Sequence, residues 1–297
     1  MDLILDVDKA AEVADAVKGL GLKRDRYLDE RYYPPPDDPR ELQLAYFAAA
    51  VAVDHRTSTF GPFEGYIDGE FFHGADALWR LARRAYPELF SPERLASLTL
   101  EEGMRLFSIG GKAVWDLGVR VLLLRDLGRK AAEAGGFAKW LDVGSVAELA
   151  ERLKRARAYE DPVKKKALLL AKFLEGRGLL KFSDPQSFDV PVDNHVSRIA
   201  YRLGIVDADY AWLFSGAELT REEDVEVREK VKLAWRLVSR FSGVDPFTLD
   251  DFLWSFGRTI CTRDSPKCGQ CPLKAVCKAN RLGQYPPEHA HSLTWYY

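Results

Sequence analysis

The sequence CTRDSPKCGQCPLKAVC, residues 261–277, contains all four cysteines of the 297-residue chain. They follow the spacing C-x6-C-x2-C-x5-C, so four thiols fall within one short segment. Disulfides that staple a secreted fold are dispersed along a chain, whereas a tight group of cysteines in a reducing compartment indicates a metal site. Thiolates are soft ligands that suit iron–sulfur clusters, Zn²⁺ and Cu(I). The segment therefore predicts a metal centre near the C-terminus.

The cysteine spacing bears on which metal is bound. Structural zinc sites commonly use two short cysteine pairs separated by a longer gap. Here Cys268 and Cys271 form one C-x2-C unit, and there is no second such pair. Cys261 precedes the unit and Cys277 follows it at unequal separations. The pattern therefore favours an iron–sulfur cluster, and zinc remains the alternative.

Outside this segment the pattern is helical almost throughout, and strand-like alternation is scarce. Apolar residues recur at a spacing near 3.6 in four long segments: 77–86, 145–158, 162–175 and 224–241. Ser145 and Glu148 form a capping-box pattern that opens one helix. Pro162 suits the first turn of the next helix, and Gly204 suits the end of a helix that begins after Asp193. The expected fold class is all-α.

Two polar stretches upstream of the cysteines contain groups that can catalyse a reaction. The stretch VPVDNHVSR, residues 190–198, places Asp193 before an expected helix, where an aspartate by itself is most often an N-cap. The stretch KKKALLLAK, residues 164–172, places three lysines at another helix start, which is electrostatically unfavourable because that end is positive. Such a cost is easier to understand if one lysine has a chemical task. A nucleophilic lysine must be neutral part of the time, and these surroundings favour the neutral amine.

These three segments resemble the helix–hairpin–helix DNA glycosylase superfamily. The cysteine spacing is similar, residue for residue, to the cluster loop of endonuclease III and of the mismatch adenine glycosylase. VPVDNHVSR resembles the V-D-T-H-x-x-R segment of endonuclease III and is closer to P-V-D-x-R-V of the archaeal 8-oxoguanine glycosylases. KKKALLLAK is similar to the K-T-A-x-V-V and K-T-V-V-F-A-V-K-M segments of the same two families.

The resemblance implies a [4Fe–4S] cluster with four cysteine ligands, Cys261, Cys268, Cys271 and Cys277. It places the catalytic lysine at Lys165 and the catalytic carboxylate at Asp193. The implied function is a base-excision DNA N-glycosylase with associated AP-lyase activity, acting on double-stranded DNA that contains a damaged or mismatched base. Lys165 would attack C1′ of an extruded nucleotide and form a Schiff base, while Asp193 would stabilise the positive charge on the sugar.

The resemblance also implies a division into two helical domains. Residues 105–204 are expected to form the central domain, with the hairpin and the catalytic aspartate. Residues 1–104 are expected to pack with residues 205–297, which contain the cluster loop at 257–280. The protein is expected to act as a monomer.

The sequence departs from the superfamily at the hairpin. The family reads L-P-G-V-G-x-K, with glycines whose amides approach a DNA phosphate, whereas residues 159–165 read YEDPVKK. An alternative nucleophile is Lys112, in the glycine-containing stretch SIGGKA at residues 108–113. Two other functions remain open: an N-glycosylase of a modified nucleoside or nucleotide, such as a deazaguanine, and a non-catalytic nucleic-acid-binding or cluster-binding relative.

Charge and hydropathy bear on the expected partner. The net charge is −2, whereas a nucleic-acid binder usually has a basic surplus that neutralises phosphates. Residues 151–202 nonetheless contain 12 Lys and Arg against 7 Asp and Glu, and residues 258–281 contain 6 against 1. No stretch approaches the roughly 20 apolar residues of a membrane helix, and the acidic N-terminus does not read as a signal peptide. A cytoplasmic, nucleoid-associated protein is expected, with no membrane partner.

The glycine- and aromatic-rich stretch at residues 60–79 is expected to be an ordered loop with one short hairpin. Its side chains either line a pocket for the extruded base or fill a core beneath the loop. The candidates are Phe60, Phe63, Tyr66, Phe71, Phe72, His73, Asp76 and Trp79. The stretch LTWYY, residues 293–297, is aromatic for a tail and is expected to dock on the body of the protein. His55, His289 and His291 suggest no metal site, because their spacing is poor for zinc.

Overall fold

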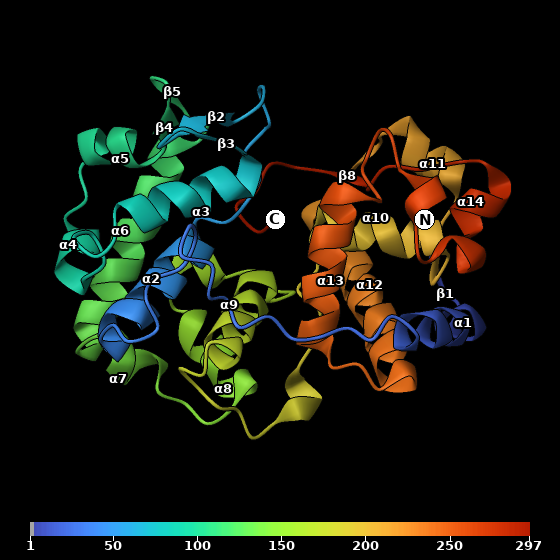
Figure 1. Cartoon of the computed structure of the whole chain (residues 1–297), viewed down its shortest axis with the longest axis horizontal. Coiled ribbons are helices and arrows are strands. Elements are labelled where there is room, and N and C mark those ends of the chain that lie inside the picture. Colours follow the sequence, from blue (N-terminus) through green and yellow to red (C-terminus); the bar gives the residue numbers. More distant parts are fainter. Residues whose placement is uncertain (1–2) are drawn as a thin grey trace. The chain divides into compact units, whose positions relative to one another are not determined.

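The computed structural model describes residues 3–297, and these are mostly helical (Figure 1). By their contacts they form two compact units. The C-terminal unit combines the chain up to Asp25 with Phe188–Thr294, and the central unit combines Arg26–Ser187 with Trp295–Tyr297. The two units are described separately below.

The helices of the central unit are α2 (Arg40–Ala52), α3 (Gly74–Arg84), α4 (Pro92–Ala96), α5 (Leu100–Leu106), α6 (Leu117–Ala134), α7 (Phe137–Leu141), α8 (Val146–Leu153) and α9 (Lys165–Gly176). Its strands form two antiparallel hairpins, β2 (Glu64–Ile67) with β3 (Glu70–His73) and β4 (Ser108–Ile109) with β5 (Lys112–Ala113). Short 3₁₀ turns lie at Arg157–Tyr159 and Pro185–Ser187.

Helix α2 is enclosed by other helices of the central unit. Its residues from Gln43 to Ala52 are all buried, and it contacts α3, α6, α7 and α9. This burial follows from its sequence, which is apolar around the whole circumference. The ring of Phe47 stacks on Phe173 of α9, with centroids 5.6 Å apart.

The packing of α2 places residues 26–104 with the central segment. The sequence had led us to expect residues 1–104 to pack with residues 205–297. Among the described residues before position 105, only those up to Asp25 belong to the C-terminal unit. The difference arises because the apolar surface of α2 is buried against α9 and its neighbours.

The C-terminal unit is built on α1 (Val7–Lys18), α10 (Asn194–Leu203), α11 (Tyr210–Ser215), α12 (Arg221–Ser242), α13 (Pro246–Thr259) and α14 (Lys278–Leu282). Its strands pair as β1 (Ile4–Leu5) with β6 (Val206–Asp207), antiparallel, and β7 (Glu218–Leu219) with β8 (Ala290–His291), parallel. The cysteine segment contains 3₁₀ turns at Cys268–Gln270 and Lys274–Val276.

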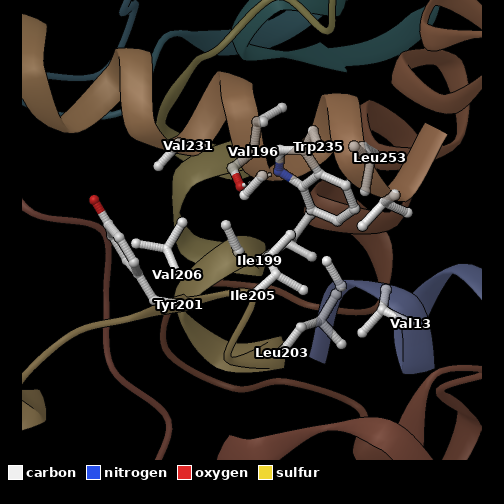
Figure 2. Close-up of a cluster of buried hydrophobic side chains, with 14 of the residues drawn as sticks. Val13, Val196, Ile199, Tyr201, Leu203, Ile205, Val206, Val231, Trp235 and Leu253 are labelled. Carbon is white, nitrogen blue, oxygen red and sulfur yellow. Dashed lines mark hydrogen bonds between the residues drawn. The ribbon is translucent and has the colours of Figure 1, made fainter. Parts of the chain in front are cut away.

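Trp235 of α12 lies in the core of the C-terminal unit, among side chains from α1, α10 and α13 (Figure 2). It is fully buried, and its indole N–H donates to the carbonyl of Val196 at 3.3 Å. Val13 belongs to the same cluster, so the first helix of the chain completes a core formed mainly by residues after Val190. This core fixes α10, the helix that follows Asp193.

Helix α9 begins at Lys165, later than the first turn predicted at Pro162. The cause is Lys164, whose φ of 66° is left-handed, so an α-helix cannot run through it. Helix α8 begins after Ser145 as predicted, and the Ser145 side chain accepts a hydrogen bond from the amide of Glu148. It ends at Leu153, which is earlier than the predicted residue 158.

The hairpin expected within residues 60–79 is confirmed by the antiparallel pairing of β2 with β3. Its turn contains Asp68 and Gly69, both with positive φ, the combination that tight two-residue hairpin turns require. Over residues 3–297, no helix has both the length and the apolar character needed to cross a membrane.

Gly128 of α6 lies against the backbone of α4. A Cβ atom at this position would lie 2.4 Å from the nitrogen of Ala96 and 2.6 Å from the carbonyl oxygen of Pro92. We expect Gly128→Ala to lower the free energy of unfolding by about 1–3 kcal/mol, because backbone atoms cannot move aside as a side chain can. Denaturant titration measures the change.

The matched control is Gly118→Ala on the same helix, where an added Cβ would meet no atom within 4 Å. It should be neutral or stabilise the protein by up to about 1 kcal/mol, because alanine favours helix over glycine. Equal stability of the two variants would contradict the close approach of α4 and α6.

Candidate active site

The turn before α9 is closed by Asp161. Its carboxylate accepts hydrogen bonds from the amides of Val163 at 3.2 Å and Lys165 at 2.9 Å. The amide of Lys164 donates to the Asp161 carbonyl at 2.9 Å. A carboxylate is favourable at the positive end of a helix. Three amides of this turn are therefore bonded within the turn itself.

Lys165, the predicted nucleophile, is the first residue of α9 and is only 6% exposed. Its Nζ donates a hydrogen bond to the carbonyl of Asp54 at 3.1 Å. Asp54 follows the end of α2, the helix that packs against α9. A lysine side chain is a flexible stem of four carbons, so a hydrogen bond from its amine restricts the position of the nitrogen.

The next residue, Lys166, is fully buried. Its Nζ lies 2.6 Å from the carbonyl oxygen of Ala52 and 3.3 Å from Nδ1 of His55. Nε2 of His55 lies 2.6 Å from the carboxylate of Asp116, which also accepts a hydrogen bond from Nε of Arg120 at 2.7 Å. Because the carboxylate needs a donor, Nε2 carries the proton, and Nδ1 is free to accept from Lys166.

Burial governs the charge of these groups. It lowers the pKa of Lys166 well below the ordinary value, and the positive charges of Lys165 and Arg120 lower it further. Burial likewise lowers the pKa of His55, and the charges of Arg120, Lys166 and Lys165 act in the same direction. His55 is therefore neutral at neutral pH.

The sequence does not reveal this buried network. From the sequence we expected no site at His55, and Asp116 and Arg120 were not candidates. One local signal was present, since Asp116 and Arg120 are four residues apart, the spacing of an ion pair on one helix face. Nothing in the sequence places His55 beside them, because 61 residues separate it from Asp116.

Asp193, the predicted catalytic carboxylate, is the N-cap of α10 in the C-terminal unit. Its Oδ1 accepts a hydrogen bond from the amide of Val196 at 2.9 Å, and its backbone is extended. The N-cap role is therefore confirmed. Within the described part of the C-terminal unit, its Oδ2 accepts no hydrogen bond.

His195 lies next to Asp193, with Nδ1 at 3.0 Å from a guanidinium nitrogen of Arg198. Burial lowers the pKa of His195; the carboxylate of Asp193 opposes this shift, and the charge of Arg198 adds to it. Asn194 lies 3.3 Å, oxygen to nitrogen, from Nε2 of His291. The start of α10 is thus surrounded by polar groups.

Lys112, the alternative nucleophile, is exposed on strand β5. Its Nζ lies 3.4 Å from the carbonyl oxygen of Pro62. The glycines before it, Gly110 and Gly111, have positive φ and form a tight turn between two short strands. Lys112 therefore lies in a β-hairpin, whereas Lys165 lies at a helix start.

The four predicted cluster ligands line one pocket of the C-terminal unit together with Ile199, Arg202, Leu203, Phe256, Ile260, Pro266 and Tyr285. A guanidinium nitrogen of Arg202 lies 3.4 Å from Sγ of Cys261. Burial raises the pKa of Cys271 to about 11 and also raises that of Cys277. Uncompensated thiolates are therefore unfavourable here, and a bound cation would favour them.

A single zinc ion with four thiolates at about 2.3 Å would draw the sulfurs into a compact tetrahedron. In residues 3–297 no three or more His, Cys, Asp or Glu side chains are grouped closely enough to hold one metal ion. The cysteines instead surround a shared pocket with mostly apolar walls. The four thiols are therefore the groups of this unit that could hold a metal cofactor.

The aromatic residues of the 60–79 stretch divide into two groups. Phe63, Phe72 and Trp79 are buried, so for them the interpretation as a core beneath the loop is confirmed. Tyr66 and Phe71 are exposed and face each other across the hairpin, with ring centroids 5.5 Å apart. Phe60 is also exposed, and its ring contacts Trp115 with centroids 5.6 Å apart.

The C-terminal stretch docks on the central unit, as predicted. The indole N–H of Trp295 donates to the carbonyl of Arg157 at 2.9 Å. The carbonyl of Tyr297 accepts from the amide of Arg56 at 3.0 Å, and Tyr297 is buried. The end of the chain thus contacts the loop that carries His55 and Arg56.

A protein-family model described as "AGOG: N-glycosylase/DNA lyase" matches residues 174–284. This range includes Asp193 and the four cysteines, and it begins after Lys165. The match therefore covers the part of the chain that forms most of the C-terminal unit.

Two solved structures share the fold. One is a trapped endonuclease III–DNA covalent intermediate, with a TM-score of 0.52, 17% identity and coverage of 94% of this chain and 99% of that chain. The other is the 8-oxoguanine DNA glycosylase of Pyrobaculum aerophilum with 8-oxoguanosine, with a TM-score of 0.53, 16% identity and coverage of 96% and 98%. The two structures show that the chain has an endonuclease III-like, mostly helical fold. The expected resemblance to the DNA glycosylases is confirmed as a resemblance by the family match over residues 174–284.

Curated relatives match over shorter segments. DEMETER-like protein 3 of Arabidopsis thaliana is 30% identical over 89 residues, which are 30% of this chain and 8% of that protein. The adenine DNA glycosylase of Schizosaccharomyces pombe is 35% identical over 79 residues, 26% of this chain and 16% of that protein. The chain therefore spans only a small part of the length of these relatives.

His55 leads to a pH prediction. Because its pKa is lower in the fold than in the unfolded chain, the unfolded chain alone takes up a proton just below pH 6.5. The contribution of His55 is thus present above pH 6.5 and is lost as the pH falls toward the lowered value. We expect a loss of up to about 1.4 kcal/mol of unfolding free energy per pH unit.

Denaturant unfolding at pH 7.5 and about pH 5.5 would measure this loss in the wild type and in His55→Gln. The variant should lose less stability between the two pH values, because its other titrating groups are those of the wild type. Equal losses in the two proteins would contradict a neutral, buried His55.

Proposed function

We propose that this chain is a base-excision DNA N-glycosylase, with an AP-lyase activity that depends on Lys165. The observation that carries the proposal is the position of the Lys165 amine: nearly buried, bonded to the Asp54 carbonyl, and at the start of the helix after the hairpin. The endonuclease III-like fold and the family match over residues 174–284 support it.

The proposed reaction begins with a nucleotide extruded from the duplex. The lone pair of Nζ of Lys165 attacks C1′, and the glycosidic bond breaks as the base leaves with its electron pair and takes up a proton. The attached amine gives one proton to the Asp193 carboxylate, which returns it to O4′ as the sugar ring opens. The product is a Schiff base between Lys165 and C1′.

The lyase step follows from the Schiff base. The iminium acidifies the C2′ hydrogen, and loss of that proton expels the 3′ phosphate by β-elimination, which nicks the strand. Asp193 has one oxygen committed to the helix cap, and we propose that the other faces the sugar. A fixed carboxylate near the developing positive charge lowers the barrier electrostatically.

Borohydride trapping with duplexes that contain abasic sites or damaged bases tests the nucleophile. We expect a covalent adduct with the wild type and a loss of at least about a hundredfold in Lys165→Ala, because that variant lacks the attacking amine. Asp193→Asn should slow base release about a hundredfold or more, because it removes the negative charge near the sugar.

Lys112→Ala is the matched control, and it should trap at the wild-type rate. An adduct that persists in Lys165→Ala and disappears in Lys112→Ala would show that Lys112 of β5 is the nucleophile. Base release without any adduct in the wild type would support the glycosylase activity and contradict the lyase activity.

We propose that Cys261, Cys268, Cys271 and Cys277 bind a [4Fe–4S] cluster. The cluster would crosslink the C-terminal segment and so support the basic side chains of the same loop, Arg263, Lys267 and Lys274, near DNA phosphates. The pocket that the four cysteines share supports a metal group held by their thiolates.

Purified protein should be brown, with a broad visible absorption, and should contain four iron and four sulfide per chain. Cys268→Ser should lose most of this absorption, since it removes one soft ligand. Lys267→Ala next to it is the control and should keep the spectrum. A colourless protein that contains zinc would contradict the cluster.

The second candidate function is the N-glycosylase of a modified nucleoside or nucleotide. The observation that favours it is the turn before α9, whose amides are bonded to Asp161 instead of being available to a phosphate. Free modified nucleosides belong in the same base-release assay. Release from these, with none from duplexes, would select this function, and release from neither would indicate a non-catalytic relative.

A further inference from the structure

The end of helix α2 carries an unusual set of hydrogen bonds. The last carbonyls of a helix have no partners within it and need donors from elsewhere. Here five successive carbonyls, those of residues 52–56, all accept hydrogen bonds from side chains of other elements. We call these five carbonyls, of Ala52, Val53, Asp54, His55 and Arg56, the carbonyl row.

Three basic side chains supply most of the donors. Lys166 donates to Ala52 at 2.6 Å and Lys165 donates to Asp54 at 3.1 Å. Arg120 of α6 donates to the remaining three, the carbonyls of Val53, His55 and Arg56. The start of α9 and the first turn of α6 are thereby tied to the end of α2.

A second set of bonds closes the arrangement. Lys166 and Arg120 both reach the carbonyl row, and they are also joined through His55 and Asp116. All four side chains are at least nine-tenths buried. Buried ionisable groups cost free energy, and apolar side chains of similar volume would often be neutral or stabilising in their place. The arrangement thus has a cost that packing alone does not explain.

Lys172, on the same helix, is buried like Lys166 and contacts aromatic rings. It is 4% exposed, and its Nζ lies 5.2 Å and 5.8 Å from the ring centroids of Phe173 and Tyr27. It makes cation–π contacts with aromatic faces, whereas Lys166 bonds to the carbonyl row beside Lys165. The two residues provide a matched pair for experiments.

We propose that Lys166, His55, Asp116 and Arg120 are positioning residues that hold the carbonyl row in place, so that the Asp54 carbonyl holds the amine of Lys165 ready for attack. The proposal rests on the proposed function of Lys165 as the nucleophile. None of the four residues touches the substrate in this account. They act through Asp54 and the backbone around it.

The chemistry gives a reason for such support. A small misplacement of a reacting atom, of about 1 Å, can cost about a hundredfold in rate. A lysine amine at the end of four methylene groups is mobile unless something holds it. A single hydrogen bond from the Lys165 amine to the Asp54 carbonyl does not by itself fix the direction of the nitrogen lone pair.

The first experiment compares Lys166→Met with Lys172→Met, since methionine keeps most of the volume and removes the amine in both. Single-turnover borohydride trapping should fall about tenfold or more in Lys166→Met and by less than about twofold in Lys172→Met. Binding to a duplex with an uncleavable abasic-site analogue should be the same in both, because Lys166 is fully buried. Equal trapping rates in the two variants would overturn the proposal.

The second experiment needs neither DNA nor catalysis. Formaldehyde with cyanoborohydride methylates lysine amines, and peptide mass spectrometry measures the rate at Lys165 relative to exposed Lys112. We expect this rate to rise about threefold or more in Lys166→Met, because the carbonyl row loosens, and to stay unchanged in Lys172→Met. An unchanged rate in Lys166→Met would overturn the positioning role.

The two experiments separate this proposal from the function on which it rests. If the wild type forms no adduct with DNA, Lys165 is not the nucleophile, and the methylation rate alone then decides whether the network holds its amine. If the adduct forms, and Lys166→Met and Lys172→Met both trap at the wild-type rate, Lys165 remains the nucleophile and the positioning role is contradicted.

Discussion

A helix that ends inside a protein must find hydrogen-bond donors for its last carbonyls, and α2 ends inside the central unit. Its residues from Gln43 to Ala52 are all buried, so donors for the carbonyls at its end come from other parts of the protein. Lys166 of α9 and Arg120 of α6 meet this requirement at the carbonyls of Ala52 and Val53, and Lys165 donates to the next carbonyl, that of Asp54. The proposed nucleophile thus belongs to the same set of hydrogen bonds that surrounds the buried end of α2.

In the C-terminal unit a single helix, α10, links the two predicted site elements. Asp193 caps its first turn, and Arg202 near its end contacts Cys261 and several carbonyls of the cysteine loop. Arg198, between them, donates to the carbonyls of Cys261 and Gly257. The packing of Trp235 and its neighbours against α10 therefore bears on both the carboxylate and the thiols (Figure 2).

The turn before α9 forms without the glycines of the superfamily pattern. The superfamily pattern has glycines there, whereas this chain places Lys164 in a left-handed conformation and bonds the turn amides to Asp161. The carboxylate occupies the position at the helix start where an anion is favoured. A duplex phosphate would have to be bound by other groups.

The sequence by itself determined the features that depend on neighbours a few residues apart. Helical periodicity, the caps at Ser145 and Asp193, the short hairpin of residues 64–73 and the grouping of the cysteines all follow from such local interactions. The start of α9 was predicted three residues early, because the left-handed conformation of Lys164 depends on the bonds of Asp161.

Only the tertiary structure decided which unit residues 26–104 join and what surrounds Lys165. The apolar surface of α2 shows that the helix is buried but not against which partner, since hydrophobic attraction has no direction. In the network, His55 contacts Asp116, 61 residues away, and Lys166, 111 residues away. No periodicity or spacing in the sequence predicts that these side chains lie close together. The network exists because three helices converge where one of them ends.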